Sequence, residues 1–151
     1  MKKILSGILL IILLPGFAIS QCNNSLIDLC LKDNGGAKSL KEFPVRLKTV
    51  KKKDPDPYAR FTVALKRGVQ YRFNIKNDSL NIADAKLTLS DDYKLLGTTF
   101  DEINNINDNY FDFYCKNSGN YYLTMQFMDK EGGCAVGMIS FVDNFNVYSS
   151  K

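Results

Sequence analysis

The sequence of 151 residues contains neither histidine nor tryptophan. Without histidine a Ser-His-Asp triad and a Cys-His pair are excluded, and so are most zinc sites other than all-cysteine ones. Without tryptophan the chain lacks one common platform for stacking a sugar ring, although tyrosine can take that place. We therefore expect no catalytic residues and a protein that acts by binding.

The chain also lacks an apolar run long enough for a transmembrane helix. Its longest run, residues 4–14, follows Lys2 and Lys3 and is followed by a proline-glycine break and small residues up to Ser20. This pattern predicts a signal peptide that is cleaved to leave a soluble product. Loss of Lys2 and Lys3 lowers the formal net charge from +4 to +2, which is little reason to expect a nucleic-acid or membrane partner. The mature protein is expected in the periplasm, on the outer cell surface or outside the cell.

All four cysteines lie in the exported part of the chain: Cys22, Cys30, Cys115 and Cys134. An even number in an oxidising compartment predicts two disulfides. If residues 121–127 form one extended strand, Cys115 and Cys134 lie roughly 25 Å apart, too far to be bonded. This geometry favours pairing the N-terminal cysteines with the C-terminal ones. The alternative is Cys22 with Cys30 and Cys115 with Cys134.

Alternation of apolar and polar residues predicts strands along most of the chain. The clearest examples are residues 111–115 and 121–127. Residues 134–142 are apolar on both faces, which predicts a strand that lies centrally in its sheet or beneath other chain. Further strands are expected at residues 43–47, 61–65, 69–75, 85–89 and 94–99. A short helix is expected within residues 24–32, where it would close one end of the strand layers.

About eight short strands without a helix to connect parallel neighbours predict an all-β fold. The expected architecture is an antiparallel two-sheet β-sandwich of jelly-roll or Ig-like topology, with a short N-terminal helix. No internal repeat or interdomain linker is present. The predicted organisation is a signal peptide at 1–20, a helical segment at 21–42 and the β-sandwich domain at 43–151.

Two local features of this sandwich can be predicted from turn residues. Residues 61–65 and 69–75 are joined by a short turn that ends at Gly68, which predicts a hairpin. Gly119-Asn120-Tyr121 is typical of a tyrosine corner, in which the phenol bonds back to the backbone at a turn between sheets.

Three segments resemble the strands of bacterial pre-peptidase C-terminal sandwich domains. They are VALKRGVQYRF at 63–73, AKLTLSDDYKLLG at 85–97 and FDFYCKNSGNYYLTM at 111–125. The GGCAVG stretch at 132–137 is similar to small exported Bacteroidetes proteins of uncharacterised role. The resemblance implies a sandwich fold, and in that family such domains usually accompany secreted peptidases.

Two groups of side chains are candidates for binding a partner. Tyr110, Tyr114 and Tyr122 fall on one face if their strands pair, and a strip of tyrosines is typical of binding modules. Cross-strand packing explains the same pattern equally well. Lys51, Lys52 and Lys53 form the densest basic cluster, but acidic residues follow at once, which favours a solvated loop.

No cofactor is expected, and calcium is the one possible exception. Asp101, Glu102, Asn107 and Asp108 supply the hard oxygen atoms that calcium prefers, in a loop without the residue order of an EF-hand. The alternative is a polar loop that binds nothing. Asp101 and Asp108 are also the carboxylates that a histidine-free hydrolase would use, and such an enzyme needs both in one pocket within about 10 Å.

These observations favour a non-catalytic exported module that binds a protein or a glycan at or outside the cell envelope. Two alternatives are a structural accessory subunit of a secretion or surface machine and the carboxylate-dependent hydrolase. The proposed contacts are the three tyrosines and the lysine loop.

Overall fold

The computed structural model describes residue 22 and residues 24–142. Within them one helix, α1 (Asn24–Lys32), precedes ten strands. The predicted signal peptide lies outside the described residues. No helix in the described part is long and apolar enough to cross a membrane.

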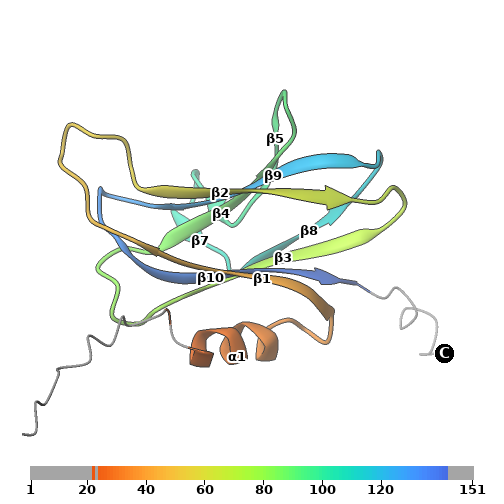
Figure 1. Cartoon of the computed structure of the whole chain (residues 1–151), viewed down its shortest axis with the longest axis horizontal. Coiled ribbons are helices and arrows are strands. Elements are labelled where there is room, and N and C mark those ends of the chain that lie inside the picture. Colours follow the sequence, from red (N-terminus) through yellow and green to blue (C-terminus); the bar gives the residue numbers. More distant parts are fainter. Residues whose placement is uncertain (1–21, 23, 143–151) are drawn as a thin grey trace, which may run out of the picture.

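Two four-stranded antiparallel sheets face each other (Figure 1). Across sheet A the order is β1 (Lys38–Leu47), β10 (Gly133–Phe141), β3 (Gln70–Asn77) and β8 (Tyr110–Tyr114). Across sheet B it is β2 (Tyr58–Leu65), β9 (Gly119–Phe127), β4 (Ala85–Ser90) and β5 (Leu95–Thr98). A small third sheet pairs β6 (Phe100–Asp101) with β7 (Ile106–Asn107). The predicted antiparallel sandwich is confirmed.

The chain alternates between the large sheets at almost every step. β1, β3, β8 and β10 belong to sheet A, whereas β2, β4 and β9 belong to sheet B. Within the two large sheets, β4 and β5 are the one pair of strands that are consecutive in the chain and also hydrogen-bonded to each other. The resulting strand orders are those of a jelly roll.

The hairpin predicted for residues 61–65 and 69–75 is wrong. β2 pairs with β9, and β3 pairs with β10 and β8, so the turn before Gly68 carries the chain from one sheet to the other. Val63 of β2 and Tyr71 of β3 are both buried in the core between the sheets. The turn residues correctly predicted that the chain reverses its direction between β2 and β3. Because the apolar faces of both strands are buried against each other, the strands lie in opposite sheets instead of pairing in one.

The tyrosine corner is confirmed in sheet B. The Tyr121 hydroxyl donates to the Asn117 carbonyl oxygen at 2.6 Å. The same residue packs its ring at the start of β9 against Phe113 of the opposite sheet, with 5.8 Å between ring centroids. The corner therefore fixes the crossing from β8 to β9.

β10 is covered on both faces, as its apolar sequence predicts. It lies between β1 and β3. One face is packed in the core of the sandwich, and Val136 and Met138 on the other face pack with Leu26 of α1. The sequence led us to expect that the helix closes one end of the sandwich, and this prediction is wrong. The helix lies flat on the outer face of sheet A because that face carries apolar residues which need cover (Figure 1).

One disulfide is formed in the described residues, between Cys22 and Cys134. It joins an N-terminal to a C-terminal cysteine, as the geometry favoured. The second predicted disulfide is absent, because Cys30 lies in the cluster under α1 and Cys115 lies in the core. The two thiols are on opposite faces of sheet A and cannot meet.

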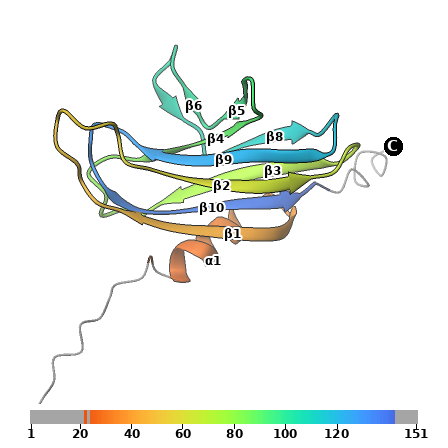
Figure 2. The same cartoon turned by 45° about the horizontal axis from the view of Figure 1, so that its top comes forward.

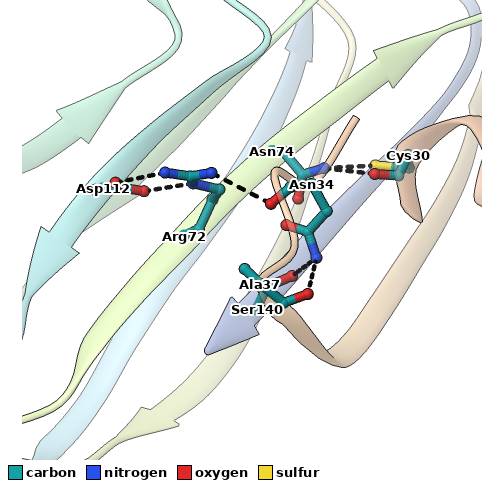
Figure 3. A network of polar contacts seen from close by, with 7 residues as sticks. All are labelled: Cys30, Asn34, Ala37, Arg72, Asn74, Asp112 and Ser140. Carbon is teal, nitrogen blue, oxygen red and sulfur yellow. Dashed lines mark hydrogen bonds and ion pairs between the residues drawn. The ribbon is translucent and has the colours of Figure 1, made fainter. Parts of the chain in front are cut away.

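A polar network fastens the end of α1 to sheet A (Figure 3). Asn74 on β3 donates to the Cys30 carbonyl oxygen at 3.0 Å. Asn34 donates to the Ser140 hydroxyl at 2.8 Å. Arg72 donates to the Asn34 carbonyl oxygen and holds Asp112 of β8 with two bonds of 2.7 and 2.8 Å. The network therefore links the helix to three strands of one sheet.

Replacing Arg72 by methionine is expected to lower the free energy of unfolding by about 1–3 kcal/mol. The change keeps the aliphatic stem but removes the paired bonds to Asp112 and the bond to Asn34. Chemical denaturation measures the loss. Asp112→Asn is the milder control because it keeps the shape and one acceptor, and an equal loss in both variants would contradict the role of the Asn34 contact.

Candidate functional site

Two hairpins project from the sandwich at the edge formed by β5 and β8 (Figure 2). One joins β4 to β5, and the other joins β6 to β7. Their turns carry Tyr93 and Ile103, each 93% exposed, and the following strands expose Leu95 and Ile106. We refer to these two turns and their four apolar residues as the hairpin tips. Side chains this exposed contribute little to the core, so their apolar surface is available for contact with a partner.

The first tip is held in shape by a carboxylate. One oxygen of Asp91 accepts the backbone N–H groups of Tyr93 and Lys94, both at 2.8 Å. These bonds favour the charged carboxylate, so the Tyr93 and Lys94 amides hold the pKa of Asp91 below its ordinary value. The turn falls between the strands predicted at residues 85–89 and 94–99, and it presents Tyr93 outward.

The second tip is also held by an aspartate side chain that accepts hydrogen bonds within its own turn. Asp101 accepts a hydrogen bond from the Asn104 side chain at 2.6 Å and from the backbone N–H of Ile103 at 2.8 Å. The Asn104 side-chain bond is the main cause that holds the pKa of Asp101 below its ordinary value. Asn105 has a positive φ of 54°, which asparagine tolerates in a tight turn. Each tip is therefore a carboxylate-capped turn rather than a loose loop.

The base of the second hairpin is bonded to sheet B. The Thr99 hydroxyl, on a residue only 1% exposed, accepts the Leu87 N–H at 3.0 Å and donates to the Asn107 side chain at 3.1 Å. Asn107 in turn donates to the Ala85 carbonyl oxygen at 3.2 Å. The exposed apolar tip consequently stands on a base that is fixed to β4.

Close contact between β5 and β8 supports the hairpins from below. A Cβ atom added to Gly97 would lie 2.4 Å from the Phe111 ring, so only glycine allows this approach. Phe111 itself stacks on Phe73 of β3, with 5.2 Å between the ring centroids. The edge of the sandwich below the tips is therefore closed by aromatic packing.

The predicted tyrosine strip is not formed. Tyr110 and Tyr114 lie on β8 in sheet A and are half exposed, whereas Tyr122 lies on β9 in sheet B. β8 and β9 are consecutive in the chain but do not pair, because the tyrosine corner takes the chain across to the other sheet. Tyr110 is covered by the Arg72 guanidinium, 4.2 Å from the ring centroid.

Tyr122 instead lines a separate polar hollow of about 490 Å³ on sheet B. The guanidinium carbon of Arg60 lies 4.3 Å from the centroid of its ring. A hydrogen bond with Asp92 raises the pKa of the Tyr122 hydroxyl. Asp91 and Thr62 complete the lining, so this hollow lies beside the first hairpin.

The predicted lysine cluster lies in the connection between β1 and β2. Lys51, Lys52 and Lys53 are exposed there. The same connection is bound to the turn before β10, where Lys130 and Asp56 form an ion pair of 3.1 Å. The lysines are therefore displayed on an anchored loop at a distance in the sequence from both hairpins.

The predicted calcium ligands lie around the second hairpin but do not converge. Asp101 and Asn107 already bond within the hairpin and to the sheet, through Asn104, Thr99 and Ala85. Glu102 is exposed in the turn. Among the described residues no group of three or more acidic or cysteine residues could hold a metal ion. Calcium binding stays a prediction without a preformed ligand set.

The two carboxylates considered for a hydrolase are not placed together in a pocket. Asp101 caps its own turn. Asp108 lines a hollow of about 370 Å³ with Asn109 and Tyr110, and Asp101 is not among its lining residues.

The order of the hairpin tips is expected to depend on pH. Asp91 and Asp101 have lowered pKa values in the folded protein, so their contribution is complete above the ordinary aspartate pKa. It is lost as the pH falls through the lowered values, below about pH 4. NMR should then show amide shifts of Tyr93 and Ile103 that titrate before the core unfolds. Titration of these amides near neutral pH would contradict the role of the caps.

No protein-family model matches the chain, and no curated protein matches it. Among solved structures it is similar to PliG of Aeromonas hydrophila, a periplasmic lysozyme inhibitor of g-type lysozyme. The TM-score is 0.51, over 71% of this chain and 89% of that one, with 15% identity. The likeness is one of fold. The resemblance to pre-peptidase C-terminal domains stays a prediction.

Proposed function

We propose that this chain is an exported, non-catalytic protein-binding module that contacts its partner through the hairpin tips. The observation that carries the proposal is the exposure of Tyr93 and Ile103 on two turns with fixed bases. A rigid aromatic or aliphatic anchor loses little conformational entropy on binding, which is why such residues dominate contact energies. The Cys22–Cys134 disulfide fits an oxidising compartment.

A g-type lysozyme is the first partner to test, because the similar fold of PliG belongs to an inhibitor of that enzyme. An enzyme that cleaves a polymer has a long cleft, and two projecting turns suit a concave surface of that shape. The four apolar residues of the tips would be buried there. In this proposal inhibition results from blocking access to the cleft.

The purified mature chain should inhibit hydrolysis of a peptidoglycan suspension by a g-type lysozyme at a stoichiometric ratio. A c-type lysozyme in the same assay shows whether the effect is selective. Binding is measured separately by calorimetry, since a protein can bind the enzyme without blocking it. Absence of both inhibition and binding would exclude lysozyme as the partner, and hydrolysis of the polymer by the chain alone would end the non-catalytic proposal.

Glycan binding is a second candidate, and the polar hollow on sheet B favours it. Arg60, Asp92 and Tyr122 offer donors and acceptors for sugar hydroxyl groups in one place. Tyr122→Phe removes one hydroxyl and should weaken binding to an oligosaccharide array by about tenfold or less. Tyr93 and Ile103 are unchanged in this variant, so it separates the two candidates.

A further inference from the structure

The four edge strands of the two large sheets differ in how they are protected against pairing. β1 contains Pro44 and a register irregularity between Ser39 and Lys41. β5 has four residues and an irregular register, and β8 has five residues. β2 has eight residues, no proline, an unbroken register with β9 and one charged residue, Arg60. Long, regular and uncharged edges are the ones that accept another strand.

The backbone groups that β2 turns toward its open side can be identified from the register. Phe127 donates to the Pro57 carbonyl oxygen, so this opposed pair is a hydrogen-bonded one. Bonded and non-bonded pairs alternate along an antiparallel ladder. Counting along β2, Thr62 and Ala64 direct their N–H and C=O groups away from β9. Nothing in the described residues bonds to these groups.

An apolar slot of about 360 Å³ runs along this same edge. β2 lines it from Thr62 to Leu65, and Lys66 directly after the strand also lines it. Leu40 and Lys41 of β1 form the opposite wall, and buried side chains of β3 and β10 lie behind it. At the slot, the N-terminal end of β1 curves away from β2 (Figure 1), and its register with β10 shifts between Ser39 and Lys41.

The rim of the slot is positively charged. Lys41 and Lys66 line it, and neither forms an ion pair within the described residues. The Lys41 ammonium also lies 5.2 Å from the centroid of the Phe43 ring, a core residue of β1. An acidic occupant would neutralise both ammonium groups, whereas a second copy of this chain would bring the same cations to the slot.

We propose that β2 binds an extended acidic segment of a partner protein as an added strand. The segment pairs with the outward backbone groups of Thr62 and Ala64, places one apolar side chain in the slot and sets a carboxylate beside Lys41 and Lys66. Main-chain bonds supply the affinity, and the slot and its cations supply the selectivity. This site lies on the edge of sheet B opposite β5, and none of the four apolar residues of the hairpin tips lines the slot.

The probe is a set of fluorescent synthetic heptapeptides that alternate leucine, valine or phenylalanine with glutamate or threonine. Fluorescence anisotropy with the full mature chain should show binding that is lost when alternate peptide nitrogens are methylated. Ala64→Pro removes one outward N–H and is tolerated at an edge, since the proline faces away from β9. It should weaken binding by about tenfold, whereas the matched control Ala64→Val should not.

Charge is tested by reversal. Lys41→Glu should weaken binding of the glutamate peptides by about tenfold or more and improve binding of lysine analogues. Hydrogen exchange gives a readout that needs no variant: peptide should protect the amides of Thr62 and Ala64 but not those of β8. A variant with Tyr93→Ser and Ile103→Ser should bind the peptides normally, so this proposal can fail or succeed independently of the lysozyme proposal.

Several results would overturn the proposal. The first is that no peptide binds at about 1 mM. The second is that methylated and unmethylated peptides bind equally well. The third is that Ala64→Pro binds the peptides as the wild type does and that peptide does not protect the Ala64 amide of the wild type. A fatty acid that fills the slot and displaces the peptides without amide protection would assign the site to a lipid. Dimers that disappear in Ala64→Pro would assign it to a second copy, and binding only after removal of residues 143–151 would assign it to the chain's own C-terminal segment.

Discussion

Replacing both Cys22 and Cys134 by alanine is expected to lower the free energy of unfolding by about 2–5 kcal/mol. The disulfide closes a loop with a sequence separation of 112 residues, so removing it releases a large amount of conformational freedom in the unfolded chain. The nine residues of α1 are too few to form a stable helix in isolation, and their packing on β10 depends on being held there. The loss should therefore include local release of the helix.

Two measurements separate the global and the local effect. Chemical denaturation gives the change in stability, and alkylation of Cys30 reports release of α1. Burial raises the pKa of the Cys30 thiol to about 12, so it should react slowly at neutral pH while the helix is docked. In the variant the reaction should be much faster under native conditions. A variant that retains wild-type stability and slow alkylation would show that packing alone holds the helix.

Reduction provides a matched control for this prediction. A reductant should destabilise the wild type by a similar amount and leave the Cys22→Ala, Cys134→Ala variant unchanged. The thiols of Cys30 and Cys115 are unpaired and are present in both proteins. A reductant effect on the double variant would point to another cause.

The variant with Tyr93→Ser and Ile103→Ser is expected to lose about 100-fold or more in affinity for the partner. Both side chains are almost fully exposed in the free chain, so their removal should change stability by less than about 0.5 kcal/mol. Binding is lost because the apolar surface that leaves water in the complex is no longer present. Titration calorimetry with the lysozyme, or with another partner identified by capture, measures the difference.

Leu80→Ser with Ile82→Ser is the matched control for the tips. These residues are 88% and 84% exposed in the connection between β3 and β4, so the control removes similar apolar surface elsewhere. It should bind as the wild type does. Equal losses in both variants would mean that general surface hydrophobicity drives association, and an unaffected tip variant would remove the hairpins from the proposed function.

The candidate site was less predictable than the fold, although its signals are present in the sequence. Asp91 and Asp101 each precede a single apolar residue in a polar turn, Tyr93 and Ile103. The pattern predicted Asp101 as a calcium ligand, but a single apolar residue in a polar turn does not by itself indicate a contact. The prediction of a tyrosine strip is wrong because it assumed that consecutive strands are neighbours in one sheet. Tyr114 and Tyr122 belong to different sheets.

The sequence by itself determined where strands form and which strand is buried on both of its faces. Alternation along residues 121–127 and the continuous apolar stretch at 134–142 are local properties that depend only on the pleat of a strand. The corner at Tyr121 was also local, because its bond reaches back only four residues. The lack of histidine, likewise, is settled without coordinates.

Only the tertiary structure decided which strands become neighbours, which cysteines meet and which edge stays open. β10 lies between β1 and β3, strands that are far from it in the sequence. That choice places Cys134 beside Cys22 and leaves Cys30 of α1 without a disulfide partner. Pairing over such separations is selected by the joint burial of many apolar faces rather than by any single turn. The free edge of β2 follows from the same selection, since a strand becomes an edge only when the whole sheet has been assembled.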